Sequence, residues 1–164
     1  MSKLYFTYSA MNAGKSAILL QAAYNYGERG MSVMLWTSGH HGSENAATGK
    51  IESRIGLEAE AHLFRSETDL YSAISKRADD APLHAIFVDE AQFLNEDQVW
   101  QLARVGDEMR LPVLCYGLRT DFQGELFPGS AVLLGIADAL VELKAVCHCG
   151  RKATMNLRVD EAGK

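Results

Sequence analysis

The stretch of sequence that decides the fold is Leu4-Tyr5-Phe6-Thr7-Tyr8-Ser9-Ala10-Met11-Asn12-Ala13-Gly14-Lys15-Ser16. Its first part is mostly apolar and predicts a strand, and the small residues that follow predict a loop that ends where a helix begins. The backbone N–H groups of such a loop point inward and meet the positive end of the helix, so they bind a triphosphate. We therefore predict that Lys15 spans the β- and γ-phosphates and that the Ser16 hydroxyl is a ligand of Mg²⁺. The predicted nucleotide-binding residues are Ser9, Ala10, Met11, Asn12, Ala13, Gly14, Lys15 and Ser16.

The residues after this loop favour the same interpretation. Apolar side chains recur at helical spacing from Ile18 to Tyr26, as expected for a helix that packs on a sheet. One departure is Ser9, which stands where the usual pattern has its first glycine. The alternative is a strand, turn and helix with an exposed lysine and no ligand, since Gly-Lys-Ser alone is a motif of low specificity.

Apolar runs alternate with helical patterns along most of the chain. The predicted strands are 4–8, 33–36, 85–88 and 113–116, and the predicted helices are 16–29, 67–79 and 95–109. This alternation predicts an α/β fold of the P-loop type, with a mostly parallel sheet flanked by helices. We expect a mobile loop over 38–50, and a further loop over 118–130 at the carboxyl end of the fourth strand, where open α/β sheets bind ligands.

Length and composition limit the classes of protein to which the chain can belong. A chain of 164 residues with 48% hydrophobic and 23% charged residues forms one main globular domain. We assign residues 1–140 to this nucleotide-binding domain and 141–164 to the start of a small appended unit. The formal charge of −5 argues against broad nucleic-acid binding. No apolar run approaches the ~20 residues of a membrane span and no leader is recognisable, so we expect a cytoplasmic protein with no membrane partner.

Two adjacent acids, Asp89 and Glu90, end the third predicted strand. In phosphate-loop proteins an acid at this place steadies Mg²⁺ together with the loop serine, and we predict that Asp89 does so. Glu90 is then available as a base that takes a proton from an attacking hydroxyl or water. The alternative is that these acids cap the next helix or face water.

Other candidates have weaker signals. Arg54 and Arg119 are candidates to neutralise charge on a transferring phosphoryl group, and the alternative for each is a solvated surface position. Phe93, Phe122 and Phe127 lie in predicted loops, where they are available to stack on a flat ring, although core packing is the alternative.

The chain has three cysteines, an odd number that argues against a disulfide framework. Cys115 lies in a predicted buried strand. Cys147 and Cys149, followed by Gly150, resemble half of a zinc site, but a structural zinc ion takes four ligands. Either the remaining ligands lie beyond Lys164 in a longer natural chain, or both residues are free thiols.

Four ordered blocks closely resemble type II thymidine kinases, particularly the bacterial ones. They are the loop 9–16, Val88-Asp89-Glu90-Ala91-Gln92-Phe93, the segment 113–122 and the segment 147–153. The resemblance implies a RecA-like α/β domain with a small zinc-bearing domain. It also implies ATP-dependent phosphorylation of the thymidine 5′-hydroxyl to dTMP, a homotetramer, and dTTP as a feedback inhibitor.

The resemblance also assigns roles to individual residues. Glu90 falls on the catalytic base of the family, Asp89 on its magnesium-associated acid, and Arg54 on an arginine that approaches the phosphates. The positions that match the thymidine site are Met11, Phe93, Leu118, Phe122, Phe127 and Asn156. One departure is the loop 39–45, which lacks the acidic and arginine element usual in the family. Family members also continue past Lys164 with a loop that closes over thymidine and a second Cys/His pair, so we expect this chain to be a C-terminally truncated form.

Two other functions remain as alternatives. A RecA-like ATPase would use Glu90 to activate water, and a non-enzymatic module would bind the nucleotide without turning it over. The acidic charge disfavours a DNA-translocating ATPase, and the aromatic loop from Leu118 to Phe127 favours a nucleoside acceptor.

Overall fold

The computed structural model describes residues 3–10, 14–39, 45–146 and 152–153, and within them seven strands form one sheet. The strands are β1 (Leu4–Ser9), β2 (Val33–Ser38), β3 (Thr48–Glu52), β4 (Glu58–Phe64), β5 (Ala85–Val88), β6 (Val113–Leu118) and β7 (Ala139–Glu142). Their order across the sheet is β3-β4-β2-β5-β6-β1-β7. Within the described part of the chain, neighbouring strands pair in parallel except β3 and β4, which form an antiparallel hairpin. The predicted mostly parallel α/β fold is confirmed.

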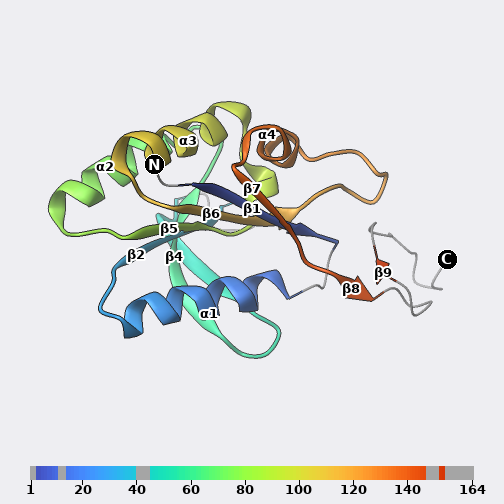
Figure 1. The fold of residues 1–164 in the computed structure, drawn as a ribbon, viewed down its shortest axis with the longest axis horizontal. Helices are drawn as coiled ribbons and strands as arrows, with labels where there is room; N and C mark the ends of the chain where they lie inside the picture. Colours follow the sequence, from blue (N-terminus) through green and yellow to red (C-terminus); the bar gives the residue numbers. More distant parts are fainter. Residues whose placement is uncertain (1–2, 11–13, 40–44, 147–151, 154–164) are drawn as a thin grey trace.

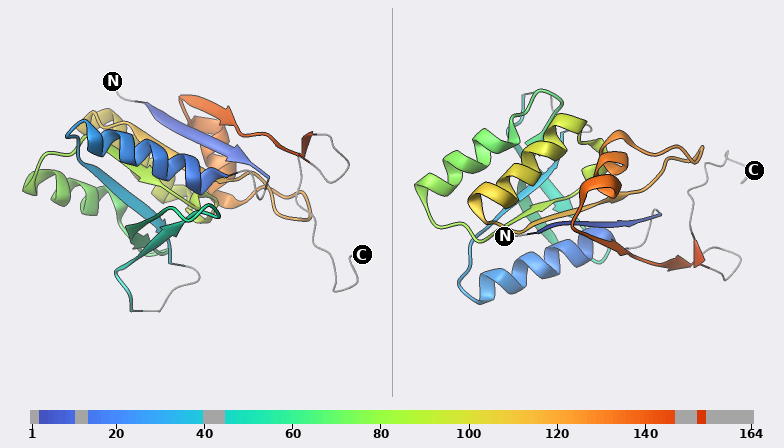
Figure 2. Two further views of the ribbon diagram at one scale, coloured as in Figure 1. Left: turned by 90° about the horizontal axis from the view of Figure 1, so that it is seen from below. Right: turned by 45° about the horizontal axis from the view of Figure 1, so that its top comes forward.

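Helices cover both faces of this sheet (Figure 1). Helix α1 (Lys15–Glu28) lies on one face, and α2 (Leu70–Asp80), α3 (Glu96–Met109) and α4 (Pro128–Ile136) lie on the other. A short 3₁₀ helix, η1 (Ala91–Phe93), follows β5 directly. The right view of Figure 2 shows the same layers, with α1 on the opposite side of the sheet from α2 and α3.

The apolar core has two parts, one on each side of the sheet. Successive side chains of a strand point to opposite faces of the sheet, so the buried strand β5 contributes side chains to both parts of the core. Phe87 packs with Leu19 of α1, while Ile86 and Val88 pack with residues of α2 and α3. This explains why the central strands are continuous apolar runs in the sequence.

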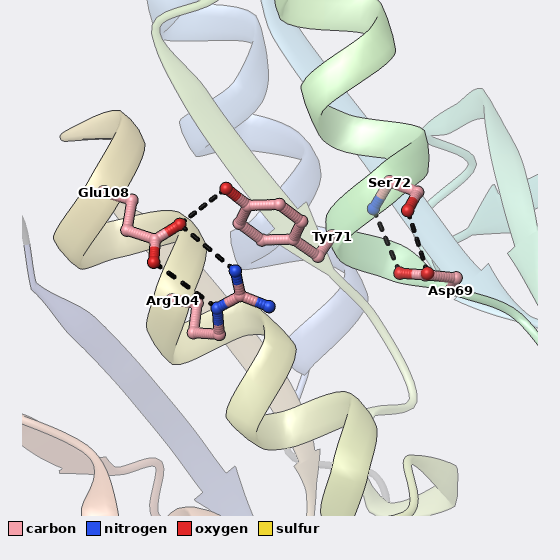
Figure 3. Close-up of polar contacts among 5 residues, drawn as sticks. All are labelled: Asp69, Tyr71, Ser72, Arg104 and Glu108. Carbon is pink, nitrogen blue, oxygen red and sulfur yellow. Dashed lines mark hydrogen bonds and ion pairs between the residues drawn. The ribbon is translucent and has the colours of Figure 1, made fainter.

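Helices α2 and α3 also meet through an exposed polar cluster (Figure 3). The Tyr71 hydroxyl donates to Glu108 Oε2 at 2.5 Å, and the Arg104 guanidinium lies 4.1 Å from the centroid of the Tyr71 ring. The hydrogen bond to Glu108 raises the pKa of Tyr71. Because exposed ion pairs contribute about 0 to 1 kcal/mol, the apolar core beneath this cluster is what holds the two helices on the sheet.

Two predicted loops, 38–50 and 118–130, are too long, because β3 begins inside the first and α4 inside the second. The hairpin of β3 and β4 was not expected, and β3 begins inside the predicted loop 38–50, because the hairpin carries exposed polar side chains such as Glu58 and Glu60. Helix α4 was not expected either, and its first residues lie in the predicted loop 118–130. Its nine residues are apolar on nearly all sides, so no helical period marks them.

The proposed domain boundary after residue 140 falls inside β7. That strand pairs with β1 from Ala139 to Glu142, so the sheet extends past the boundary. Beyond it, β8 (Ala145–Val146) and β9 (Lys152–Ala153) form a separate antiparallel pair. The rest of the proposed 141–164 unit lies mostly outside the described residues, and the unit remains a proposal.

Candidate active site

The phosphate loop connects the carboxyl end of β1 to the start of α1. Gly14 adopts a φ of 81°, a left-handed conformation that glycine takes at little cost, and α1 begins at the next residue. Lys15 lies back over the loop, since its Nζ donates to Ser9 Oγ at 3.0 Å and to the Ala10 carbonyl at 3.4 Å. Burial lowers the pKa of Lys15, and the nearby Asp89 carboxylate partly opposes this shift. Met11, Asn12 and Ala13 lie outside the described residues.

Asp89 and Ser16 are in direct contact across 73 positions of sequence. The Ser16 hydroxyl donates to Asp89 Oδ2 at 2.8 Å, and the backbone N–H of Glu90 donates to Asp89 Oδ1 at 2.9 Å. Only 6% of Asp89 is exposed, and this burial raises the pKa of its carboxyl group despite both hydrogen bonds. The structure thus brings together the two residues predicted to bind magnesium.

This pair fits a magnesium ion by the chemistry of its donors. Carboxylate and hydroxyl oxygens are hard ligands, and Mg²⁺ in phosphate-transfer sites is bound by one or two protein groups, with water and phosphate oxygens completing the shell. Among the described residues no group of three or more His, Cys, Asp or Glu side chains could hold a metal ion. Ser16 and Asp89 would supply one hydroxyl and one carboxylate to such an ion, and water and phosphate oxygens would complete its shell.

Glu90 occupies a strained turn at the end of β5. Its φ of 52° and ψ of 40° are left-handed, which a non-glycine residue adopts at a cost of about 1 to 3 kcal/mol and which is frequent at active sites. The Thr37 hydroxyl at the end of β2 donates to Glu90 Oε2 at 3.4 Å. The turn sends the chain from β5 directly into η1.

A cavity of about 380 Å³ joins these groups. Ser16, Asp89 and Glu90 line one side, and residues of the β3 strand, including Lys50, line another. Lys50 also forms an exposed ion pair with Glu58, with 3.7 Å between Nζ and Oε1. Sequence reasoning missed Thr37 and Lys50 because only the tertiary fold brings them near the acids.

The predicted acceptor residues gather at the carboxyl ends of β5 and β6. The rings of Phe93 and Phe127 meet edge to face, with 5.8 Å between centroids. Leu118 ends β6 and is half-buried, and Phe122 is 46% exposed in the connection from β6 to α4. Two further predicted residues, Met11 and Asn156, lie outside the described residues.

The two candidate arginines lie in different places. Arg54 is exposed in the turn between β3 and β4, whose residues Ile55 and Leu57 line a separate cavity against the middle of α1. Arg54 is not among the residues that line the cavity of Asp89 and Glu90. Arg119 lies beside the phosphate loop, because its backbone N–H donates to the Ser9 carbonyl at 3.3 Å.

The three cysteines also lie in different parts of the chain. Cys115 is fully buried in β6, and burial raises the pKa of its thiol, so it packs as an apolar side chain. Cys147 and Cys149 lie outside the described residues.

None of the helices in the part of the chain that the structure describes combines the length and apolar character that a membrane span requires.

Comparison with known proteins agrees with this geometry. A family model described as thymidine kinase matches residues 2–164. The thymidine kinase of Novosphingobium aromaticivorans is 67% identical over 165 residues, covering 99% of this chain and 84% of that protein. That of Mesorhizobium japonicum is 57% identical over 164 residues, covering 100% of this chain and 80% of that protein. That of Vibrio cholerae is 56% identical over 163 residues, covering 99% of this chain and 84% of that protein. The chain belongs to the thymidine kinase family.

Proposed function

We propose that this protein transfers the γ-phosphoryl group of ATP to the 5′-hydroxyl of thymidine, giving dTMP and ADP. The observation that carries the proposal is the convergence of Ser16, Asp89 and Glu90 on one cavity beside Lys15. A phosphate-binding loop next to one acid suits any nucleotide-binding protein of this fold. A second acid in the same cavity adds a proton acceptor, which phosphoryl transfer to a hydroxyl requires.

Lys15 and the backbone of residues 9–16 bind the phosphates of ATP in this proposal. Lys15 donates to Ser9 Oγ and to the backbone carbonyl of Ala10, which are neutral acceptors. A phosphate oxygen is a charged acceptor and forms the stronger hydrogen bond, so nucleotide replaces these contacts. Ser16 and Asp89 hold Mg²⁺, which when bound neutralises the charge on the phosphates. Arg119 and Arg54 remain candidates to supply further positive charge.

Glu90 takes the proton in this proposal. The thymidine 5′-oxygen bonds to the γ-phosphorus while the bond from that phosphorus to the β,γ-bridging oxygen breaks and ADP leaves. The proton of the 5′-hydroxyl moves to a carboxylate oxygen of Glu90. The Thr37 hydroxyl donates to Glu90 Oε2, and this hydrogen bond helps to orient the carboxylate.

The acceptor site uses the aromatic residues near η1. Phe93 and Phe127 form an edge-to-face pair next to the Glu90 turn and offer flat apolar surface to a pyrimidine ring. Leu118 and Phe122 extend this surface, and Met11 and Asn156 complete it by resemblance to the family.

Turnover of ATP with and without thymidine tests the proposal. A nucleoside kinase excludes water from the γ-phosphate, so thymidine should increase ATP consumption strongly and dTMP should form in equal amount. The control is 5′-deoxythymidine, which lacks the attacking hydroxyl and should not be phosphorylated. Turnover that does not depend on thymidine would favour an ATPase, and ATP binding without turnover would favour a regulatory module.

Three further features belong to the same proposal. Cys147 and Cys149 supply two ligands of a structural zinc ion in the 141–164 unit. The protein assembles as a homotetramer, which light scattering of the purified chain measures directly. The end product dTTP inhibits by competing with thymidine, so its inhibition should weaken as the thymidine concentration rises.

A further inference from the structure

Two buried polar side chains, Gln92 of η1 and Ser130 of α4, bind the main chain of one residue, Leu118. The Leu118 N–H donates to Gln92 Oε1 at 3.2 Å, and the Ser130 hydroxyl donates to the Leu118 carbonyl. Gln92 is 4% exposed and Ser130 is fully buried. We call these two hydrogen bonds the Leu118 clamp. Gln92 binds the N–H of Leu118, and Ser130 binds its C=O.

The clamp takes the place of the main-chain hydrogen bonds that a neighbouring strand would form with Leu118. Strand β6 pairs with β5 only as far as Cys115, opposite Val88, because the chain leaves the sheet at the Asp89-Glu90 turn. In a strand the N–H and C=O of one residue point to the same side, so both polar groups of Leu118 face the position that β5 has vacated. A buried main-chain group without a partner costs about 1 to 3 kcal/mol. Gln92 and Ser130 remove that cost with side chains.

Close backbone packing accompanies these hydrogen bonds. A Cβ atom at Gly117 would lie 2.8 Å from Gln92 Oε1 and 2.9 Å from the backbone nitrogen of Gln92. A Cβ atom at Gly129 would collide with the Ala91 carbonyl oxygen and lie 2.8 Å from that of Leu94. The two glycines thus let η1 fit between β6 and the start of α4.

The clamp lies between the base and the acceptor site. Gln92 is two residues after Glu90 and next to Phe93, and Ser130 is three residues after Phe127. Any shift of Leu118 relative to η1 therefore changes the spacing between Glu90 and the walls of the acceptor site. The phosphate loop connects β1 to α1, and neither Gln92 nor Ser130 belongs to it. Leu118 lies opposite Ser9 of β1 on the other side of β6, whereas both clamp hydrogen bonds are on the η1 side.

From this placement we propose that Gln92 and Ser130 are positioning residues that set the affinity for the acceptor nucleoside without affecting ATP binding. The inference rests on the proposed thymidine kinase function. It assigns Gln92 a role in orienting the acceptor site through Leu118, with no contact to the reacting atoms.

The test compares Gln92→Met with a matched control. Methionine keeps the length of the side chain and removes the acceptor for the Leu118 N–H. We expect the KM for thymidine to rise about tenfold, the factor that corresponds to one lost main-chain hydrogen bond, while the Kd for ATP measured without thymidine is unchanged. The control is Gln101→Met, since Gln101 Oε1 accepts from the Leu70 N–H at 2.8 Å between α3 and α2. This variant loses the same kind of bond away from the cavity and should keep the thymidine KM of the parent.

Ser130→Ala provides a second test in case Gln92→Met does not fold. It removes one oxygen atom and should also raise the KM for thymidine, and the double variant should show less than the product of the two effects, because both side chains hold the same residue. Hydrogen exchange at the Leu118 amide should become faster in Gln92→Met and stay slow in Gln101→Met.

Two results would overturn the inference in an active parent. One is an unchanged thymidine KM in both Gln92→Met and Ser130→Ala. The other is an equal loss of ATP and thymidine affinity, which would indicate general destabilisation. A parent that does not phosphorylate thymidine would instead refute the proposed function, and this would be visible before any variant is compared.

Discussion

Burial shifts the pKa of Asp89 upward and that of Lys15 downward, so the fold disfavours the charged form of both groups. Each shift has burial as its main cause, and the attraction between the two groups only partly opposes it. A magnesium ion and a polyphosphate would supply the opposite charges that these side chains lack. The site is therefore built for its ligands at a cost to the stability of the free protein.

Asp89→Asn should raise the free energy of unfolding of the ligand-free protein near neutral pH while abolishing phosphoryl transfer. The amide oxygen can still accept from the Glu90 N–H, and the amide NH₂ can donate to the Ser16 hydroxyl, so the contacts remain and the charge is lost. Urea denaturation and turnover measurements on the same preparations check both parts.

The direction of the Asp89 pKa shift predicts how the stability gained in Asp89→Asn should depend on pH. A raised pKa means that the folded state favours the protonated acid, and this stabilisation is present below the ordinary value of 3.8 and lost as pH rises through the raised pKa. The difference in unfolding free energy between Asp89→Asn and the parent should therefore be small in acid, grow above pH 3.8 and then level off. A difference that does not change with pH would contradict this explanation.

Single elements show which parts of the fold the sequence can predict. The central strands were predicted because they are continuous apolar runs, and α1 because its apolar side chains recur at helical spacing. The contact between Ser16 and Asp89 agrees with the local motifs that singled out both residues, while their roles stay a prediction. The hairpin of β3 and β4 was missed because many of its side chains are polar and exposed, and α4 was missed because it is apolar on nearly all sides. Thr37, Lys50 and Gln92 have no local signal, since their roles depend on neighbours that are distant in sequence.

The packing of α4 on η1 gives a prediction at this scale. Gly129→Ala should destabilise the protein by roughly 1 to 3 kcal/mol, because its Cβ would meet backbone oxygens of Ala91 and Leu94, which cannot move as a flexible side chain can. Gly135→Ala is the matched control on the same helix, where a Cβ has no neighbour within 4 Å. It should stabilise by about 0.5 to 1 kcal/mol through helix propensity. Equal effects of the two variants on urea unfolding would contradict the packing described here.

At the scale of the whole molecule, the candidate site lies along one edge of the sheet. The ends of β1, β2, β5 and β6 bring the phosphate loop, Thr37, the two acids and Leu118 to the same edge, as parallel strands in an open α/β sheet do. The candidate acceptor residues lie in η1, at the end of β6 and just before α4, whereas the phosphate loop leads from β1 into α1. The division of the chain into a nucleotide-binding part and a 141–164 unit remains a proposal, and zinc is its test.

If Cys147 and Cys149 are zinc ligands, the natural chain purified under reducing conditions should contain about one zinc ion per chain, and Cys147→Ser or Cys149→Ser should lose it. Cys115→Ser is the control, because this thiol is buried inside the sheet and should not affect zinc content. The zinc site would be refuted if elemental analysis found no zinc in the parent, or if both variants kept their zinc.

The central claim is that Glu90 accepts the proton of the thymidine 5′-hydroxyl, and the kcat of Glu90→Gln tests it most directly. Glutamine keeps the shape of the side chain and the contact with Thr37 but cannot take a proton, so kcat with saturating thymidine and ATP should fall by roughly 10²-fold or more. The Kd for ATP should stay that of the parent, because Glu90 does not hold the phosphates. A kcat equal to that of the parent, with dTMP still formed, would show that another group takes the proton and would contradict the account.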